Sequence, residues 1–498
     1  MLPYSFLRTI RFISVISVIS ALLWNAMAAY AVKPMDVDED ATSNISAPRY
    51  EDEIRLDLEN SLGIAINNSI DLKSIGAQER VRDCVISQRW RDFFPTLSVS
   101  YMQTEEARLR EADSRQYRFT AESNLVVYDG GQKKLAYDVA KLQSILARND
   151  YRIAVNRLIA DTGNSFFSLL QQRDAIAIHK KTLVQGQMQL KFISKELELG
   201  EATRFDRMEI EAKVKEIELN LEKAKDDFAI GLNKFKLMLR MDWRQRVALK
   251  GDIEKDFIIS RINEEKHPID DLIVTSLRNR KEIDSADVEF MINQKKYLMS
   301  KYYYFPEFSL GASYSLTDDR YFPREQGWGV NFKVTTRIFG NSATMGGGYT
   351  EEGNKNARIL SSNGSVNLLD RLDYEQELVQ SSIDYITAKY KKKEIRQQIA
   401  LEVATNYSAL INGWKMIEIA KQQLELYDAQ LEIERLKANL GDSRRYDLIK
   451  KEIERGESAL SYLNAIIRYL QLASTFEIAL GVDVGFLQVA LRRNGSTP

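Results

Sequence analysis

The most constraining feature of this sequence is a stretch from about residue 133 to Gly200 that contains no proline. Nearly 67 residues of uninterrupted helix, at about 1.5 Å per residue, would be on the order of 100 Å long. Apolar residues recur along it at helical spacing: Val139, Leu142, Leu146, Ile153, Leu158, Phe166 and Leu169. No compact domain needs such a helix, so the pattern predicts coiled-coil-like packing with one solvated side.

The chain also repeats itself. Pro95 and Pro306 open similar segments 211 positions apart, and the same register holds over about 60 residues. Further on, Gly200 and Gly441 open similar turns 241 positions apart. The second copy therefore carries about 30 extra residues, which we place at about 340–372. This insertion is rich in Gly, Ser and Asn, so we expect a loop near the junction of strands and helix.

Each copy follows one order: helices, two strands, a very long helix, a Gly turn and a return helix. The predicted segments are a signal peptide 1–31, an acidic flexible lead-in 32–53, a first repeat 54–240, a connector 241–267, a second repeat 268–485 and a tail 486–498. Within the repeats we expect hairpins at 94–128 and 306–339, long helices at about 133–198 and 375–439, and turns at 200–206 and 441–447.

Residues 1–31 have the parts of a secretory signal: basic Arg8 and Arg11, an apolar core of about 13 residues, and small residues before the expected cleavage. An uncleaved anchor is the alternative, although that core is short for a span of about 20 residues. No other segment predicts a transmembrane helix. The single cysteine, Cys84, excludes an internal disulfide and is expected to be a small buried residue.

The four predicted strands alternate apolar and polar residues over about 9–12 positions, which fits a membrane β-strand or a soluble sheet packed on helices. In the membrane reading, the lipid-facing residues are Leu97, Val99, Phe308, Leu310, Val330 and Phe332. Four strands cannot close a barrel, and an open sheet edge cannot face lipid. Three chains would together supply 12 strands.

Several function classes are excluded by composition. The chain has 70 basic and 71 acidic residues, so it lacks the charge of a nucleic-acid binder. Its two histidines, His179 and His267, lie far apart, and the common hydrolase and phosphate-binding motifs are absent. We therefore predict no enzyme, no catalytic residue, no cofactor and no metal site. An exported coiled-coil scaffold or adhesin of the cell envelope stays open as an alternative.

The ordered set of motifs, given twice, resembles the TolC-like outer-membrane factors of efflux and secretion systems over about residues 55–485. It consists of the strand starts at Phe94 and Phe305, the segment Val126–Gly131, the turns Leu199–Asp206 and Leu440–Asp447, and the helix end Ala479–Asp483. The resemblance implies a mainly α fold with some β structure. In it, antiparallel coiled-coil helices form a periplasmic α-barrel, and four strands per chain join a shared 12-stranded trimeric β-barrel.

The resemblance also assigns roles at the helix tips. Asp206 looks like the family's gate aspartate, but the family's partner Tyr and Arg are replaced by Ala438 and Ser443. We hypothesise that Arg444 or Arg445 supplies the missing Arg. Asp447 looks like the first aspartate of the family's constriction ring, whereas the second is replaced by Lys450. The turns at Gly200 and Gly441 are implied to dock the adaptor.

The family implies a homotrimer in the outer membrane of a Gram-negative bacterium, in contact with its lipid and with a long periplasmic portion. The implied partners are a periplasmic adaptor, also called a membrane fusion protein, and an inner-membrane efflux pump or ABC transporter, as in type I secretion. An aspartate near a helix start can equally be a simple cap. The cargo, whether drug, metal or protein, is not given by the sequence.

Overall fold

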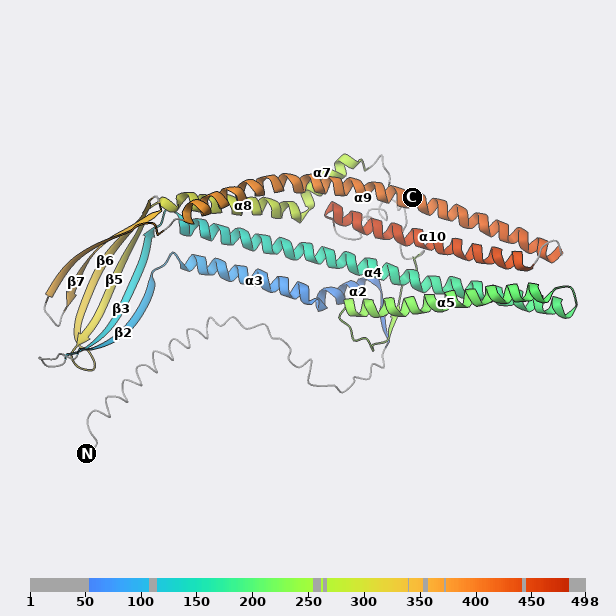
Figure 1. Ribbon diagram of the computed structural model, residues 1–498, viewed down its shortest axis with the longest axis horizontal. Coiled ribbons are helices and arrows are strands. Elements are labelled where there is room, and N and C mark those ends of the chain that lie inside the picture. Colours follow the sequence, from blue (N-terminus) through green and yellow to red (C-terminus); the bar gives the residue numbers. More distant parts are fainter. Residues whose placement is uncertain are drawn as a thin grey trace, which may run out of the picture. The chain divides into compact units, whose positions relative to one another are not determined.

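The structure is a computed structural model that describes residues 53–106, 114–253, 261–262, 267–338, 340–352, 357–370, 373–440 and 445–482. The signal peptide, nearly all of the acidic lead-in and the C-terminal tail predicted above lie outside these residues. Residues from Ile54 onward form one compact unit, in which a β-sheet lies at one end of long helices (Figure 1).

The first repeat begins with a short strand and two helices, followed by a hairpin and a long helical hairpin. Its elements are β1 (Ile54–Leu56), α2 (Leu58–Asn68), α3 (Ile70–Arg91), β2 (Thr96–Glu106), β3 (Ser114–Tyr128), α4 (Gln132–Glu198) and α5 (Arg204–Met238). The 67 residues of α4 correspond to a length on the order of 100 Å.

The second repeat has the same order with additional strands. The connector before it holds β4 (Val247–Leu249). The elements of the second repeat are α7 (Ile269–Asn279), α8 (Lys281–Lys301), η2 (Tyr302–Tyr304), β5 (Glu307–Asp318), β6 (Glu325–Ile338), β7 (Asn341–Glu352), β8 (Ala357–Asn367), α9 (Asp373–Leu440) and α10 (Arg445–Leu480). The predicted fold class, mainly helical with an antiparallel sheet, is confirmed.

Two expectations about the strands were wrong. The segment 340–372 is no loop, because most of it forms the hairpin β7–β8, and the chain therefore contributes six strands to one sheet instead of four. The strand order is β2-β3-β5-β6-β7-β8, with every neighbouring pair antiparallel. Gly-rich composition predicted a loop, but pairing along β6 overrides this local preference.

The turn from β3 into α4 explains the motif around Asp129. The Asp129 carboxylate accepts hydrogen bonds from the backbone N–H groups of Gly131 and Lys133, at 3.0 and 2.8 Å, and so caps the helix. Gly130 has a φ of +70°, and a Cβ there would lie 2.5 Å from the Cβ of Phe305. Only glycine fits this turn, which joins the sheet to the helical part.

The main hydrophobic core lies in the middle of the helical part. Phe166 of α4, Phe235 of α5 and Phe476 of α10 are fully buried there. The short parallel pair β1–β4 adds Leu56 to the same core. Cys84 was expected to be buried, but it is exposed on α3, since that helix packs only one side against α4. None of the described helices has an apolar stretch long enough to cross a bilayer.

Candidate functional site

The two faces of the sheet differ in chemistry. Cross-strand partners share a face, and the ladders place one set of apolar side chains together through all six strands. The six residues predicted to face lipid all lie in this set and are all exposed: Leu97, Val99, Phe308, Leu310, Val330 and Phe332. We call this surface the apolar face of the sheet.

The opposite face is polar and better covered. Along β5, exposed Phe308, Leu310 and Tyr314 alternate with half-buried serines and Gly311, and Thr317 is buried. Glycines 327 and 329 of β6 are buried on the same side. A sheet that packs on a water-soluble core shows the reverse, with apolar side chains buried and polar ones exposed. The exposure pattern therefore disfavours the soluble-sheet interpretation.

An ion pair spans two intervening strands on the polar face. Arg118 of β3 and Glu352 of β7 approach to 3.8 Å on this face. Two other strands separate β3 from β7 in the sheet, so a flat sheet would put them about 14 Å apart. Long side chains close such a gap readily only when the sheet curls toward them. The contact favours a sheet that curls toward its polar face, as the wall of a barrel does.

Aromatic rings gather near both ends of the strands. Tyr117 and Tyr321 lie with ring centroids 5.6 Å apart at the end remote from the helices. At the helix end, Tyr374 packs on Tyr303 and Tyr304 at 5.1 and 4.4 Å, and its hydroxyl donates to the Ser300 carbonyl at 3.1 Å. Burial, followed by the neighbouring Tyr304, raises the pKa of Tyr374 to about 12. Exposed rings near strand ends are typical of membrane-interface girdles, whereas Tyr374 is buried where the sheet meets the helices.

At the other end of the helices, Asp206 lies in a complete capping box. Its carboxylate accepts hydrogen bonds from the backbone N–H and the hydroxyl of Thr203, at 2.9 and 2.6 Å. The Asp206 N–H in turn donates to the Thr203 hydroxyl at 3.1 Å. This pair fixes the start of α5 after the turn at Gly200, which has a φ of +80°. The capping role is thus observed, while the gate role stays a prediction.

The two repeats meet at the tip through Arg445. Its Nε donates to Glu196 near the end of α4 at 2.9 Å, and its guanidinium lies 5.1 Å from the ring of Phe192. Ile193, Ile210 and Ile449 form a small buried cluster beside this pair. Sequence reasoning selected Arg445 but expected it to serve Asp206 rather than Glu196. Positions 196 and 445 are not equivalent in the two repeats, so the repeat pattern carried no signal for Glu196.

The structure describes two more of the predicted tip residues, Asp447 and Lys450, but shows no contact of either with Asp206. Asp447 and Lys450 are both exposed on the first turns of α10, next to buried Leu448 and Ile449. Their role in a ring between copies stays a prediction. Gly441 and Arg444 lie outside the described residues.

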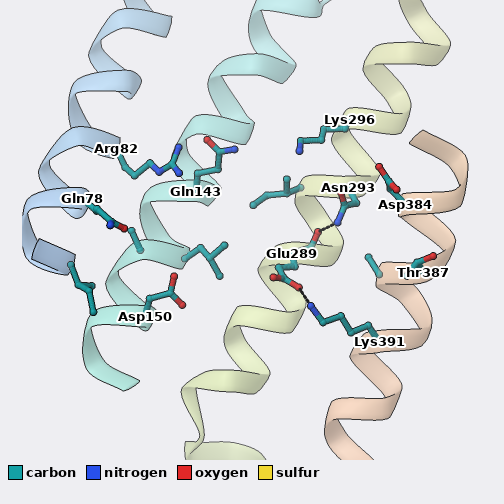
Figure 2. Close-up of a pocket in the computed structure, with 15 residues that line it drawn as sticks. Gln78, Arg82, Gln143, Asp150, Glu289, Asn293, Lys296, Asp384, Thr387 and Lys391 are labelled. Carbon is teal, nitrogen blue, oxygen red and sulfur yellow. Dashed lines mark hydrogen bonds and ion pairs between the residues drawn. The ribbon is translucent and has the colours of Figure 1, made fainter. Parts of the chain in front are cut away.

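A groove of about 460 Å³ lies between the pair α3–α4 and the pair α8–α9 (Figure 2). Charged side chains of both signs line it, including Asp150 and Lys296, and Lys391 pairs with Glu289 at 3.1 Å. This mixture of acidic and basic side chains is typical of a solvent-filled groove between two pairs of helices. Within the described residues, no group of three or more His, Cys, Asp or Glu side chains is placed to hold a metal ion.

Sequence reasoning missed two charged contacts in the helical part. Arg280, between α7 and α8, is almost fully buried and pairs with Glu282 at 2.9 Å and with Glu402 of α9. Glu452 of α10 is also buried, with Arg435 of α9 at 3.5 Å. Burial raises the pKa of Glu452, and the charge of Arg435 opposes this. No local motif marks the contacts Arg280–Glu402 and Arg435–Glu452, because these partners lie 122 and 17 positions apart in the sequence.

Comparison with known proteins agrees with this geometry. Residues 62–239 match the family described as outer membrane efflux protein. No curated protein sequence matches the chain significantly.

Several solved structures have a similar fold. The outer membrane protein VceC of Vibrio cholerae is 13% identical with a TM-score of 0.69, and the match covers 86% of this chain and 96% of VceC. The outer membrane channel CmeC of Campylobacter jejuni is 11% identical with a TM-score of 0.68, over 88% and 89% of the two chains. The open MtrE outer membrane channel of Neisseria gonorrhoeae is 13% identical with a TM-score of 0.68, over 86% and 89%. The family match over residues 62–239 and the shared fold both agree with the resemblance of this chain to the TolC-like outer membrane factors.

Proposed function

We propose that three copies of this chain form an exit duct through the outer membrane and periplasm of a Gram-negative bacterium. The observation that carries this proposal is the inverted exposure of the sheet, with apolar side chains outside and polar side chains on the opposite face. Outer-membrane barrels have this arrangement because lipid surrounds them and water fills them. One chain offers an open sheet, so several chains must share the barrel.

The helices supply the periplasmic part of the duct. α4 and α9 have 67 and 68 residues, enough for lengths on the order of 100 Å each. The turn at Gly200 lies at the end remote from the sheet, where a periplasmic adaptor would dock. An inner-membrane efflux pump or ABC transporter would deliver the cargo, and the protein would catalyse no reaction. The fold suits drug, metal or protein cargo alike.

The cheapest test of the duct uses the purified full-length protein. We expect it to need detergent for solubility, to migrate differently on gels when heated, to have the mass of a trimer, and to form conducting pores in planar bilayers. An envelope scaffold or adhesin would be soluble without detergent and would form no pores. That result would contradict the proposal, and the exposed apolar face argues against it.

The gate proposal for Asp206 requires a test that separates charge from capping. Asp206→Asn removes the charge but keeps an oxygen that can accept from the Thr203 N–H. Thr203→Ala keeps the charge and removes the cap hydroxyl. If Asp206 holds the tip closed, Asp206→Asn should increase single-channel conductance, and Thr203→Ala should do so less. Equal effects of the two variants would leave only the capping role.

The ring proposal concerns the exposed Asp447 and Lys450. Three copies would bring three carboxylates and three ammonium groups to the tip, and their charges would cancel. Lys450→Asp should therefore make the pore select cations over anions, as measured by reversal potentials in a salt gradient. An unchanged reversal potential would place Lys450 outside the constriction.

A further inference from the structure

The insertion of the second repeat is a membrane-type hairpin continuous with the sheet. β7 pairs with β6 without a break from Gly327–Glu352 to Ile338–Asn341, and β8 pairs with β7 along its full length. Apolar and polar residues alternate in this hairpin as they do in β2, β3, β5 and β6. Exposed Met345, Leu360 and Val366 lie on the apolar face. The opposite face of the hairpin carries Thr344, Gly346, Gly348, Ser361, Asn363 and Ser365.

Side-chain packing shows that β7 is fitted to β6. A Cβ at Gly347 would lie 2.8 Å from the ring of Phe332, so the glycine makes room for this ring on the apolar face. The rings of Trp328 and Tyr349 lie 5.1 Å apart across the same pair of strands. A glycine covered by an aromatic ring from the next strand is a known way to stabilise sheets. The three consecutive glycines thus have a structural role that a loop would not require.

The sheet nevertheless ends in two open edges. In the described part of the chain, β2 pairs only with β3, and β8 pairs only with β7. Each edge leaves a row of backbone N–H and C=O groups without a strand partner, beside exposed apolar side chains such as Leu97 and Val366. In hydrocarbon no water can satisfy these groups, so these edges must be covered.

The occupant that fits both edges is a second copy of the chain. β2 leaves the helical part after α3, and β8 returns to it before α9, so β8 of one copy and β2 of the next run antiparallel. Because each copy contributes an even number of strands, neighbouring copies pair antiparallel all the way around a closed ring. Pairing also makes the apolar face continuous, because Val366 and Leu97 lie on the same side of the sheet.

We propose that β8 of each copy pairs with β2 of the next, and that three copies close an 18-stranded barrel. The number three rests on the proposed function, whereas the β8–β2 pairing rests on the sheet itself. Because barrel diameter grows roughly linearly with strand number, this barrel is about 1.5-fold wider than one of 12 strands. Its added wall is lined mainly by glycine, serine, threonine and asparagine, with Ile359 among them, which suits the passage of bulky polar cargo.

Disulfide cross-linking of the full-length protein tests the pairing. In a Cys84→Ser background, Val366→Cys is combined in turn with Leu97→Cys, Val99→Cys and Tyr101→Cys, which scan the register along β2 on one face. We expect one of these pairs to give covalent trimers after oxidation in outer membranes. Co-expression of the two single-cysteine variants, one of them tagged, should give a dimer and so prove that the bond joins different copies.

The matched control removes the hairpin. The pair Val334→Cys with Leu97→Cys joins β6 to β2 and should not cross-link in the full chain, because β7 occupies that edge of β6. Ser342 and Asn367 pair at the base of the hairpin, so deleting 342–367 leaves ends that can be joined. In this deletion variant, β6–β2 cross-links should appear and the barrel should narrow to 12 strands, as seen end-on by electron microscopy.

The outcomes separate the inference from the duct. A β6–β2 cross-link in the full chain, or no β8–β2 cross-link at any scanned position in a protein with the mass of a trimer, would overturn the inference and leave the duct standing. A β8–β2 cross-linked ring of another size would keep the pairing and overturn the trimer.

Discussion

The sheet and the central helical core use the same apolar residue types in opposite ways. In the core, Phe166 is 1% exposed and is packed among α4, α5 and α10. In the sheet, Phe332 of β6 is 50% exposed. Since exposing a ring to water costs free energy, this comparison supports the proposal that lipid covers the apolar face.

The helix tips form a third environment, which is intermediate in polarity between the core and the sheet. There, a small cluster around Ile210 and Ile449 is buried, while the ion pair of Arg445 and Glu196 and the capping box of Thr203 and Asp206 hold the chain ends. Polar contacts therefore contribute a larger share of the stability at the tip than in the core. Such contacts break more easily than a packed core, which suits a region proposed to open.

The largest expected difference between core and sheet comes from removing the same ring in each. Phe166→Ala should lower the free energy of unfolding by about 3–5 kcal/mol, because it leaves a cavity. Phe332→Ala should lower it by about 1 kcal/mol in detergent, because half of this ring has no protein contact. Denaturant unfolding followed by circular dichroism measures both. A larger effect at Phe332 would contradict the contrast between the two regions.

A charge on either face of the sheet sharpens the same contrast. Val330→Arg places a charge on the apolar face and should cost about 2–4 kcal/mol of folding into lipid vesicles. Asn331→Arg, one position along on the polar face, should be nearly neutral because its side chain faces water. The fraction of heat-modifiable protein after refolding into vesicles reports the difference. If both variants reduced the refolded fraction equally, the assignment of an apolar and a polar face would be wrong.

The buried carboxyl group of Glu452 should make the stability of the helical region depend on pH. Burial raises the pKa of Glu452, so the folded state holds this proton more tightly than the unfolded state does. The stability from this group is then full below the unfolded pKa and is lost as the pH rises through the folded pKa. Glu452→Gln should add about 1 kcal/mol at neutral pH and reduce the pH dependence. Glu457→Gln, exposed on the same helix, is the control and should change neither.

An effect as small as that of Glu452→Gln is expected at the tip. Thr203→Ala removes the cap hydroxyl of α5 and should cost about 1 kcal/mol. Hydrogen exchange of the first turn of α5 should increase, whereas exchange around Phe166 should not change. Faster exchange throughout the helical part would mean that the tip and the core unfold together, and that the tip is not a separate region.

Much of this fold could be predicted because its signals are local. The absence of proline and the helical spacing of apolar residues predict α4 and α9. Alternation predicts the faces of β2, β5 and β6, since neighbouring side chains on a strand must point to opposite sides. One irregularity escaped this reasoning: a bulge between Val126 and Tyr128 turns Tyr128 onto Phe308, with ring centroids 6.0 Å apart.

The sequence by itself determined the doubled order of helices and strands, the long helices and the two chemistries of the sheet, because each follows from residues near one another in the chain. Only the tertiary structure decided that Gly346, Gly347 and Gly348 form a strand, since the ring of Phe332 and the β6 ladder replace the side-chain contacts that glycine lacks. Likewise, only the tertiary structure brought Arg445 to Glu196, because that contact depends on how two repeats pack together.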